Sequence, residues 1–418
     1  MIVISARRDG RSRVFAGSGR ANGPGAAGRG AILEQRSRIN FMDAQDFADV
    51  LAAVRSFVRE QVIPREEEIE ETDAIPESLR QAAREMGLFG YALPEEYGGL
   101  GLSLSEEVRL AFELGYASPA FRSMFGTSNG IAGQVLVNAG TEEQKRQWLP
   151  RLASGEVIGA FALTEAEAGS DPSTLSTTAV KDDDGNYVIN GAKRFITNAP
   201  EADVFMVFAR TGGPGSRGIS TFLVERDVPG LKVGPPDEKM GQRGAHTAEV
   251  FFDNVRVPAS AMVGPEGTGF RTAMASLAHG RLSIAAVCVG LAQRILDETV
   301  AYAKERAQGG RKIGEYQLVQ GMIADSQAEL YAGRAMVLEA ARAYDAGEDR
   351  KLGPSCAKYF CSEMLGRVAD RAVQVFGGMG YMRGVAVERF YRDARLFRIY
   401  EGTSQIQQLV IAKRLLAD

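Results

Sequence analysis

Hydrophobic residues in the first third of the chain recur at helical spacing. From Asp43 onward, apolar side chains fall three and four positions apart until Pro64 ends the run, a pattern that predicts an amphipathic helix. The apolar positions of this run are Phe47, Val50, Leu51, Val54, Phe57, Val58 and Val62. The same periodicity predicts helices over 77–86, 106–114, 126–138 and 141–152. We therefore expect residues 43–160 to form an N-terminal helical domain.

The hydrophobic period changes twice more along the chain. From residue 161 it falls towards two, and short β-branched or aromatic runs separated by turn residues predict strands over 187–196, 204–209, 219–224, 250–252 and 255–257. No helices interleave with these runs, which favours an antiparallel β-domain over 161–270. The helical period then returns, and it predicts helices over 281–306, 317–344, 355–376 and 404–416. Long helices with short connections indicate a bundle over 271–418.

Composition and charge narrow the possible chemistry. The 418 residues carry 49 Lys and Arg against 53 Asp and Glu, a net charge of −4, so no global field would draw the chain to nucleic acid or to a membrane surface. No uninterrupted apolar run approaches the roughly 18 residues of a membrane span. The 3 Cys and 2 His are too few and too scattered for a zinc site or a disulfide framework, so we expect no metal. Carboxylates, hydroxyls, backbone amides or a bound cofactor are left to carry any chemistry.

The N-terminal stretch of the chain differs from the rest. Residues 1–40 contain many Arg, Gly and Ala but, as acids, Asp9 and Glu34 alone. An Arg-rich, acid-poor N-terminus is typical of a transit peptide, but Gly and Pro interrupt any amphipathic helix here. We therefore favour a disordered tail over residues 1–42, or an upstream translation start before Met42, and a cytoplasmic protein. The alternative is a transit-like extension, which would place the protein in the mitochondrial matrix.

Two segments present hydroxyl and aromatic side chains in and next to the β-domain. In FALTEAEAGSD (161–171), Thr164 and Ser170 lie beside a tight turn at Gly169, and such a loop can offer hydroxyls and backbone amides to a polar ring or a phosphate. In KRFITN (193–198), alternation along a strand places Phe195 and Thr197 on one side, which suits a flat heterocycle. The alternatives are a connector between domains for the first segment and ordinary core packing for the second.

A carboxylate stands directly before the last predicted helix. In YEGTSQIQ (400–407), Glu401 precedes Gly402, and Thr403 or Ser404 is the expected N-cap, with Ser404 and Gln407 able to form a capping box. Glu401 can simply complement the helix dipole. A catalytic glutamate would instead be held against apolar surface, where desolvation raises its pKa towards the operating pH. The two environments shift the pKa in opposite directions.

Two glycine-rich helix exits carry polar side chains. Arg306 and Gln308 are followed by Gly309 and Gly310, and the segment 374–380 reads QVFGGMG. Either exit could approach a pyrophosphate, because Arg supplies the counter-charge and glycine admits a ligand close to the backbone. Helix C-caps explain the glycines equally well.

Taken together, these segments resemble the acyl-CoA dehydrogenase family, flavoenzymes that desaturate acyl-CoA thioesters. The likeness runs from about Asp43 to Leu416 and is carried by several motifs in order, with an ending similar to that of short- and medium-chain members. The motifs are LPEEYGGLG at 93–101, LTEAEAGSD at 163–171, RFITN at 194–198, MGQRGAHTAEVFFDNVRVP at 240–258, QVFGGMGY at 374–381 and YEGTSQIQ at 400–407. The resemblance implies a mainly α fold with a central antiparallel β-domain, a C-terminal four-helix bundle and assembly as a homotetramer.

The resemblance also assigns roles to individual residues. It implies that FAD lies between the β-domain and the bundle. The residues expected at the flavin are Phe161, Leu163, Thr164, Phe195 and Thr197, with Ser170 at its phosphate or at the CoA arm. Arg306, Gln308, Gln374, Gly377 and Gly378 are the FAD contacts expected from a neighbouring subunit, and Thr403 and Gln405 touch FAD again. The substrate-binding residues implied are Ser170, Arg281, Tyr400 and Gly402.

The mechanism implied by the resemblance rests on Glu401 as the catalytic base. Glu401 would take the α-proton of the acyl thioester while the β-hydrogen leaves as hydride to the flavin, which gives a trans-2-enoyl-CoA, a step of fatty-acid β-oxidation. Reduced flavin would pass electrons to an electron-transfer flavoprotein. Some members carry the base one residue before Arg281, but here that residue is Gly280, so the role falls on Glu401.

Departures from the family pattern leave alternatives open. Gly309 stands where the family usually has phenylalanine, and Phe195 stands where many members have tryptophan. Ala278 stands where some members use an acid to bind CoA, and the neighbouring His279 could substitute for that acid. Arg122 coincides with an arginine that glutaryl-CoA dehydrogenases use for the distal carboxylate, although we expect a surface or helix-terminal arginine there. An acyl-CoA oxidase, a glutaryl-CoA-type dehydrogenase and a non-catalytic flavin-fold binding protein are the alternative functions.

Overall fold

The N-terminal helices contribute to more than one hydrophobic core, one of them formed among themselves and another shared with the sheet. The computed structural model describes them from Met42 onward. Residues 1–41 and 418 lie outside the described range, so the expected tail or transit-like extension falls outside it too, apart from Met42. Helix α1 is capped by the Asp43 side chain, which accepts a hydrogen bond from the backbone N–H of Gln45 at 2.9 Å. The helices of this domain are α1 (Ala44–Phe57), α2 (Glu66–Thr72), α3 (Glu77–Glu85), α4 (Leu104–Leu114), α5 (Pro119–Thr127), α6 (Gly133–Ala139) and α7 (Glu142–Ser154).

The helix predicted over 126–138 is broken into two. A π-helical turn over Ser128–Ala132 separates α5 from α6. Its polar side chains are buried and hold neighbouring segments: Ser128 Oγ accepts from the backbone N–H of Gly159 at 2.9 Å, and Asn129 Nδ2 donates to the Leu88 carbonyl at 3.1 Å. Periodicity misses this break because a π turn shifts the apolar stripe without ending it.

The middle of the chain forms a single sheet with the order β1-β4-β2-β3-β7-β6, and β5 pairs with β4. The strands are β1 (Gly159–Ala162), β2 (Thr178–Lys181), β3 (Tyr187–Thr197), β4 (Val204–Arg210), β5 (Ile219–Glu225), β6 (Leu231–Pro236) and β7 (Thr247–Val257). The pairings β2–β3, β3–β7, β6–β7 and β4–β5 are antiparallel, as expected. Strands β1 and β2, by contrast, both run parallel to β4, so the sheet is mixed and not wholly antiparallel. The two runs expected over 250–257 belong to one strand.

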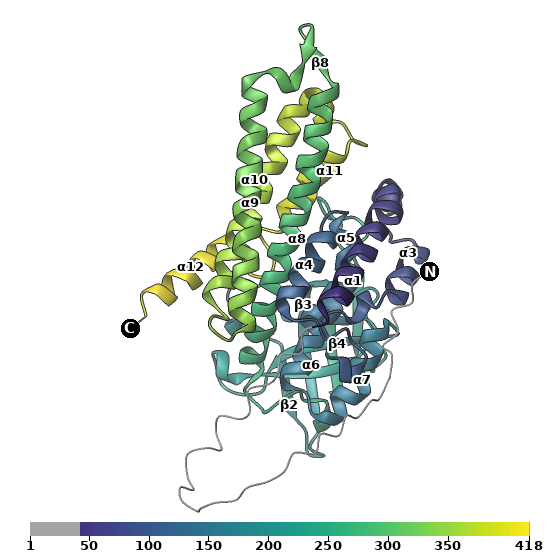
Figure 1. The fold of residues 1–418 in the computed structure, drawn as a ribbon. Coiled ribbons are helices and arrows are strands. Elements are labelled where there is room, and N and C mark those ends of the chain that lie inside the picture. The colour runs from purple at the N-terminus through teal and green to yellow at the C-terminus, as the bar shows by residue number, and fades with distance from the viewer. Residues whose placement is uncertain (1–41, 418) are drawn as a thin grey trace, which may run out of the picture.

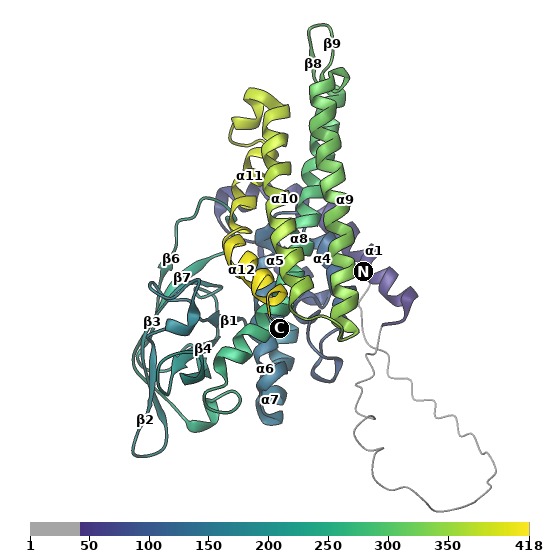
Figure 2. The same cartoon turned by 90° about the vertical axis from the view of Figure 1, so that its left-hand side faces the viewer.

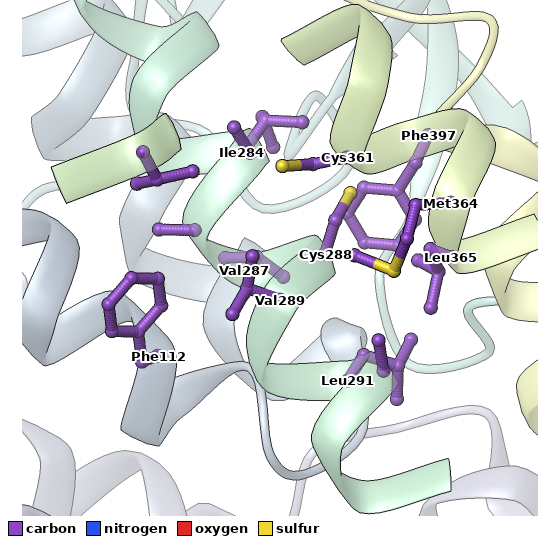
Figure 3. Packing of buried hydrophobic residues seen from close by; sticks show 14 of the residues in the cluster. Phe112, Ile284, Val287, Cys288, Val289, Leu291, Cys361, Met364, Leu365 and Phe397 are labelled. Atoms are coloured by element: carbon purple, nitrogen blue, oxygen red, sulfur yellow. The ribbon is translucent and has the colours of Figure 1, made fainter. Parts of the chain in front are cut away.

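The C-terminal domain is the predicted helical bundle, and its central helix also faces the N-terminal domain. Its helices are α8 (Gly269–Glu305), α9 (Gln317–Asp345), α10 (Leu352–Phe376), α11 (Ala386–Leu396) and α12 (Ser404–Leu415). Figure 3 shows Phe112 of α4 on one side of α8, and Met364 and Phe397 on the other. Because α8 contacts both domains, it fixes the bundle against the N-terminal helices.

Helix α8 is long and apolar enough to cross a membrane by length and composition alone, but 78% of its most apolar window is buried inside the protein. It is therefore the core helix of the bundle. Its far end leads into a small hairpin, β8 (Ala307–Gln308) and β9 (Arg311–Lys312), which lies at the tip of the bundle away from the sheet (Figures 1 and 2).

Candidate active site

The loop between α11 and α12 carries Glu401 into a cavity between the sheet and the bundle. Glu401 and Gly402 both have left-handed backbone conformations, with φ of +53° and +87°, so the chain reverses sharply just before α12. Thr403 is the N-cap, and its hydroxyl accepts from the backbone N–H of Ile406 at 3.2 Å.

The capping box expected between Ser404 and Gln407 does not form. Ser404 lies one residue inside the helix, and its hydroxyl donates to Glu363 at 2.6 Å. Gln407 Nε2 instead donates back to the carbonyls of Glu401 and Gly402, at 3.1 Å each. The first turn of α12 thus braces the loop that carries Glu401.

The Glu401 carboxylate is desolvated. Its Oε2 is shielded from solvent and has no hydrogen-bond partner within residues 42–417. Burial raises the pKa of this carboxyl, while cationic side chains nearby act in the opposite direction, those of Arg122, Lys358, Arg281 and His279. Of the two environments considered from the sequence, the structure therefore has the one that raises the pKa.

Gly280 of α8 makes room for this carboxylate. A Cβ atom built on Gly280 would lie 2.6 Å from Glu401 Oε2, well inside van der Waals contact. A side chain at 280 and a glutamate at 401 therefore compete for the same space.

Residues predicted from three separate motifs meet in this cavity. Its lining includes Phe161, Leu163, Thr164 and Ser170 from β1 and the loop after it, Phe195 and Thr197 from β3, Arg281 from α8, and Tyr400, Glu401 and Gly402. The first and the last of these segments are more than 200 residues apart in the sequence, and the packing of the sheet against the bundle brings them together.

A buried ion pair, which sequence reasoning missed, holds the loop after β1. Lys193 Nζ donates to Glu165 Oε1 at 2.8 Å and to the Leu163 carbonyl at 3.1 Å, with the Lys193 side chain fully buried. Burial alone would raise the pKa of Glu165, but Lys193 and the N–H groups of Ser176 and Thr177 outweigh it and lower the pKa to about 2. A lysine at an inward-facing position of a strand was the available signal.

A bulge in β3 aims Phe195 at the cavity. The register between β3 and β7 shifts between Lys193 and Ile196, and Phe195 has a φ of +57°. Phe195 and Thr197 both line the cavity, as expected, but Phe195 lies in the bulge and not in a regularly alternating stretch of the strand. Phe195 is 58% exposed, which is unusual for a large aromatic residue unless a ligand covers it.

Arg122 is neither at the surface nor at a helix end, as the sequence led us to expect. It lies inside α5, is 3% exposed, and lines the same cavity as Glu401. Its guanidinium donates to Ser283 Oγ at 2.7 Å, its Nε has no partner, and no carboxylate of residues 42–417 lies within 4.0 Å. Gly126, one turn later, gives the side chain its space, because a Cβ there would lie 2.4 Å from Arg122 Nε. The expectation failed because α5 begins at Pro119 and is packed on all sides.

Other residues singled out from the sequence do not line the cavity of their own chain. Arg306 and Gln308 are exposed near the far tip of α8, at the hairpin marked β8 in Figure 1. Other predicted FAD contacts that do not line the cavity are Gln374, Gly377 and Gly378 at the end of α10, and Thr403 and Gln405 at the start of α12. His279 does not line the cavity either, and its Nε2 lies 2.8 Å from Glu107 of α4.

Sequence comparison covers almost the entire described chain. Residues 45–156, 160–255 and 267–416 match the N-terminal, middle and C-terminal domains of acyl-CoA dehydrogenases, respectively. The chain belongs to the acyl-CoA dehydrogenase family. An acyl-CoA dehydrogenase of Bacillus subtilis is 41% identical over 364 residues, which cover 87% of this chain and 96% of that protein. The enzyme is thus an oxidoreductase of this family, and the fold predicted from the sequence is confirmed.

Solved structures of the family superpose closely on this chain. Butyryl-CoA dehydrogenase from Megasphaera elsdenii matches with a TM-score of 0.86 and 34% identity, covering 90% of this chain and 99% of that one. A glutaryl-CoA dehydrogenase in complex with glutaryl-CoA matches with a TM-score of 0.85 and 36% identity, covering 90% of this chain and 96% of that one.

The cofactor of the enzyme is FAD, and the cavity fits it. Phe161, Leu163 and the exposed Phe195 ring offer apolar surface to a flat ring system, and the hydroxyls of Thr164 and Thr197 stand beside them. No group of three or more His, Cys, Asp or Glu in the described part of the chain is placed to hold a metal ion.

Proposed function

We propose that the enzyme converts a saturated acyl-CoA thioester into its trans-2-enoyl-CoA, with Glu401 as the base that removes the α-proton. The observation that supports this most is the environment of Glu401. Glu401 lines the cavity, its Oε2 is shielded from solvent without a hydrogen-bond partner, and burial raises the pKa of the carboxyl, as a general base near neutral pH requires. When bound, FAD accepts the β-hydrogen as hydride.

The chain itself offers groups for binding and polarising the thioester. Arg281, which is 8% exposed and lines the cavity, has the charge to bind the CoA portion. The backbone N–H of Glu401 makes no hydrogen bond within residues 42–417, so it is the donor we propose for the thioester oxygen, where negative charge develops as the α-proton leaves. Tyr400 and Gly402 line the cavity on either side of the base.

We further propose that the enzyme works as a homotetramer. The bundle exposes large apolar side chains, among them Leu318 at 86%, Tyr331 at 73% and Tyr381 at 84%. A second copy would cover such surface. The FAD contacts expected at Arg306 and Gln308 lie far from the cavity of their own chain, which supports their being given to a neighbour.

We also propose that the reduced enzyme passes its electrons to an electron-transfer flavoprotein, and that it acts in fatty-acid β-oxidation in the cytoplasm. An acyl-CoA oxidase would use oxygen instead. Rapid reoxidation of the reduced enzyme by oxygen would favour the oxidase, and slow reoxidation with fast transfer to an electron-transfer flavoprotein would favour the dehydrogenase.

Adding a panel of acyl-CoA thioesters to the purified enzyme without oxygen tests the activity directly. We expect at least one thioester of the panel to bleach the flavin absorbance rapidly after mixing, with a trans-2-enoyl-CoA as product. A holoenzyme that no thioester bleaches would be a flavin-fold binding protein, and our proposal would be wrong.

A second candidate substrate class carries a distal carboxylate. Arg122 supports it, because a buried guanidinium in the cavity without a carboxylate partner would gain a charge-assisted pair from such a substrate. The matching glutaryl-CoA dehydrogenase structure is consistent with this class.

Comparing glutaryl-CoA with octanoyl-CoA and isobutyryl-CoA in wild type and Arg122→Met decides between the classes. If the substrate is dicarboxylic, we expect kcat/KM for glutaryl-CoA to fall by about 10- to 100-fold in the variant, the size of a lost hydrogen bond to a charged group. Arg122→Met also removes a cation that lowers the pKa of Glu401, which affects all three substrates alike. The decisive quantity is therefore the additional loss for glutaryl-CoA relative to the two monocarboxylic thioesters. Wild-type preference for octanoyl- or isobutyryl-CoA would exclude the dicarboxylic class.

A further inference from the structure

Lys358 is buried directly behind the loop that carries Glu401. It lies on α10, is 0% exposed, and its Nζ donates to the Gly402 carbonyl at 2.7 Å. Within residues 42–417 this ammonium has no carboxylate within 4.0 Å and no other hydrogen-bond partner. Buried lysines are rare unless paired with a carboxylate, so a lysine held by one backbone carbonyl calls for a reason.

The carbonyl that Lys358 holds belongs to the strained part of the loop. Glu401 is not glycine, yet it has a φ of +53°, and Gly402 follows with +87°. Such a conformation persists only when its surroundings fix it from several sides. Gln407 Nε2 holds the Gly402 carbonyl from α12, and Lys358 holds it from α10. The two donors lock the turn that points the Glu401 side chain into the cavity.

The same ammonium acts on the charge of Glu401. Its positive charge lowers the pKa of Glu401, as do Arg122, Arg281 and His279. Burial lowers the pKa of Lys358 itself to about 8. The charged and titratable groups that face Lys358 are Cys288 and Arg281 from α8, Glu363 from α10, and Glu401.

We propose that Lys358 is the positioning residue of the catalytic base: its ammonium fixes the Gly402 carbonyl, and thereby the direction of the Glu401 carboxylate. This inference rests on the proposed role of Glu401. Lys358 does not line the cavity.

The holoenzyme variant Lys358→Met tests both effects. We expect it to keep its FAD, to lose about 10- to 100-fold in kcat because the base is misplaced, and to change KM little. An α,α-dideuterated substrate should slow the variant more than the wild type, since proton removal becomes the slower step. The acidic limb of the kcat/KM profile should move to higher pH, because Glu401 has lost a neighbouring cation.

Met364→Ala on the same helix is the matched control, since Met364 is equally buried but lies in the apolar core.

Two further variants make the outcome decisive. Lys358→Gln keeps a hydrogen-bond donor without the charge, so it should shift the pH profile with a smaller loss of kcat; it also serves if Lys358→Met does not accumulate as holoenzyme. If Lys358→Met and Met364→Ala lose the same activity with an unshifted pH profile, Lys358 only packs and the inference is wrong. If Glu401→Gln keeps its turnover, Glu401 is not the base and the proposed function is wrong, whatever Lys358→Met shows. This result distinguishes failure of the proposed function from failure of the inference about Lys358.

Discussion

Replacing Glu401 with glutamine should leave FAD bound and lower turnover by at least about 10²–10⁴-fold, the usual contribution of a general base. Glutamine has nearly the same shape as glutamate but cannot accept the α-proton. Because the carboxylate makes no hydrogen bond through Oε2, its replacement should disturb little else. Flavin absorbance of the purified variant measures cofactor content, and anaerobic bleaching by acyl-CoA measures the chemical step.

The pH profile of the wild type gives an independent check of the same residue. Burial raises the pKa of Glu401, and a base works only when deprotonated, so kcat/KM should rise with pH through that raised pKa and not through the ordinary range of a glutamate. The acidic limb should be absent from the residual activity of Glu401→Gln. Near-normal turnover in this variant would remove Glu401 from the mechanism.

Adding a single methyl group at position 280 should also damage catalysis severely. In Gly280→Ala the new Cβ would lie 2.6 Å from Glu401 Oε2, so the carboxylate has to move. A displacement of about 1 Å can cost about 100-fold in rate, and we expect a loss of this order in kcat with FAD retained. Stopped-flow bleaching of the flavin measures it.

Gly321→Ala is the matched control for this substitution. Gly321 lies inside helix α9, and a Cβ there meets nothing within 4 Å. Alanine should therefore leave turnover unchanged and stabilise the helix slightly. If both variants turn over like the wild type, the carboxylate adapts without cost and Gly280 does not set its position.

Periodicity predicted the long elements of this fold well because their burial is regular. Helices α9 and α10 and strands β4 and β5 each bury one continuous face or run, which the sequence displays directly. Strands β1, β2 and β6 are short or carry little alternating pattern, and their pairing depends on partners far along the chain. Local sequence could not predict them.

The candidate site was predictable where the motif itself supplies the chemistry. Glu401 and the cavity residues of β1 and β3 were found because hydroxyl, aromatic and acidic side chains cluster in their motifs. The desolvation of Glu401 and the burial of Arg122 depend instead on how α5, α8 and the loop before α12 meet. Such tertiary contacts leave no periodic trace, and the interpretation of Arg122 as a surface residue failed for that reason.

The space that Gly126 leaves for Arg122 has a use in sorting uncharacterised sequences. The Arg122 side chain can lie against the next turn of α5 only because Gly126 has no side chain, since a Cβ there would lie 2.4 Å from Arg122 Nε. Homologous chains with arginine at the position of Arg122 and glycine at the position of Gly126 can thus bury the guanidinium beside the cavity. In chains with a larger residue at the second position, the arginine side chain must take another direction. Scanning genomes for the pair would pick out which uncharacterised homologues to assay first with anionic thioesters.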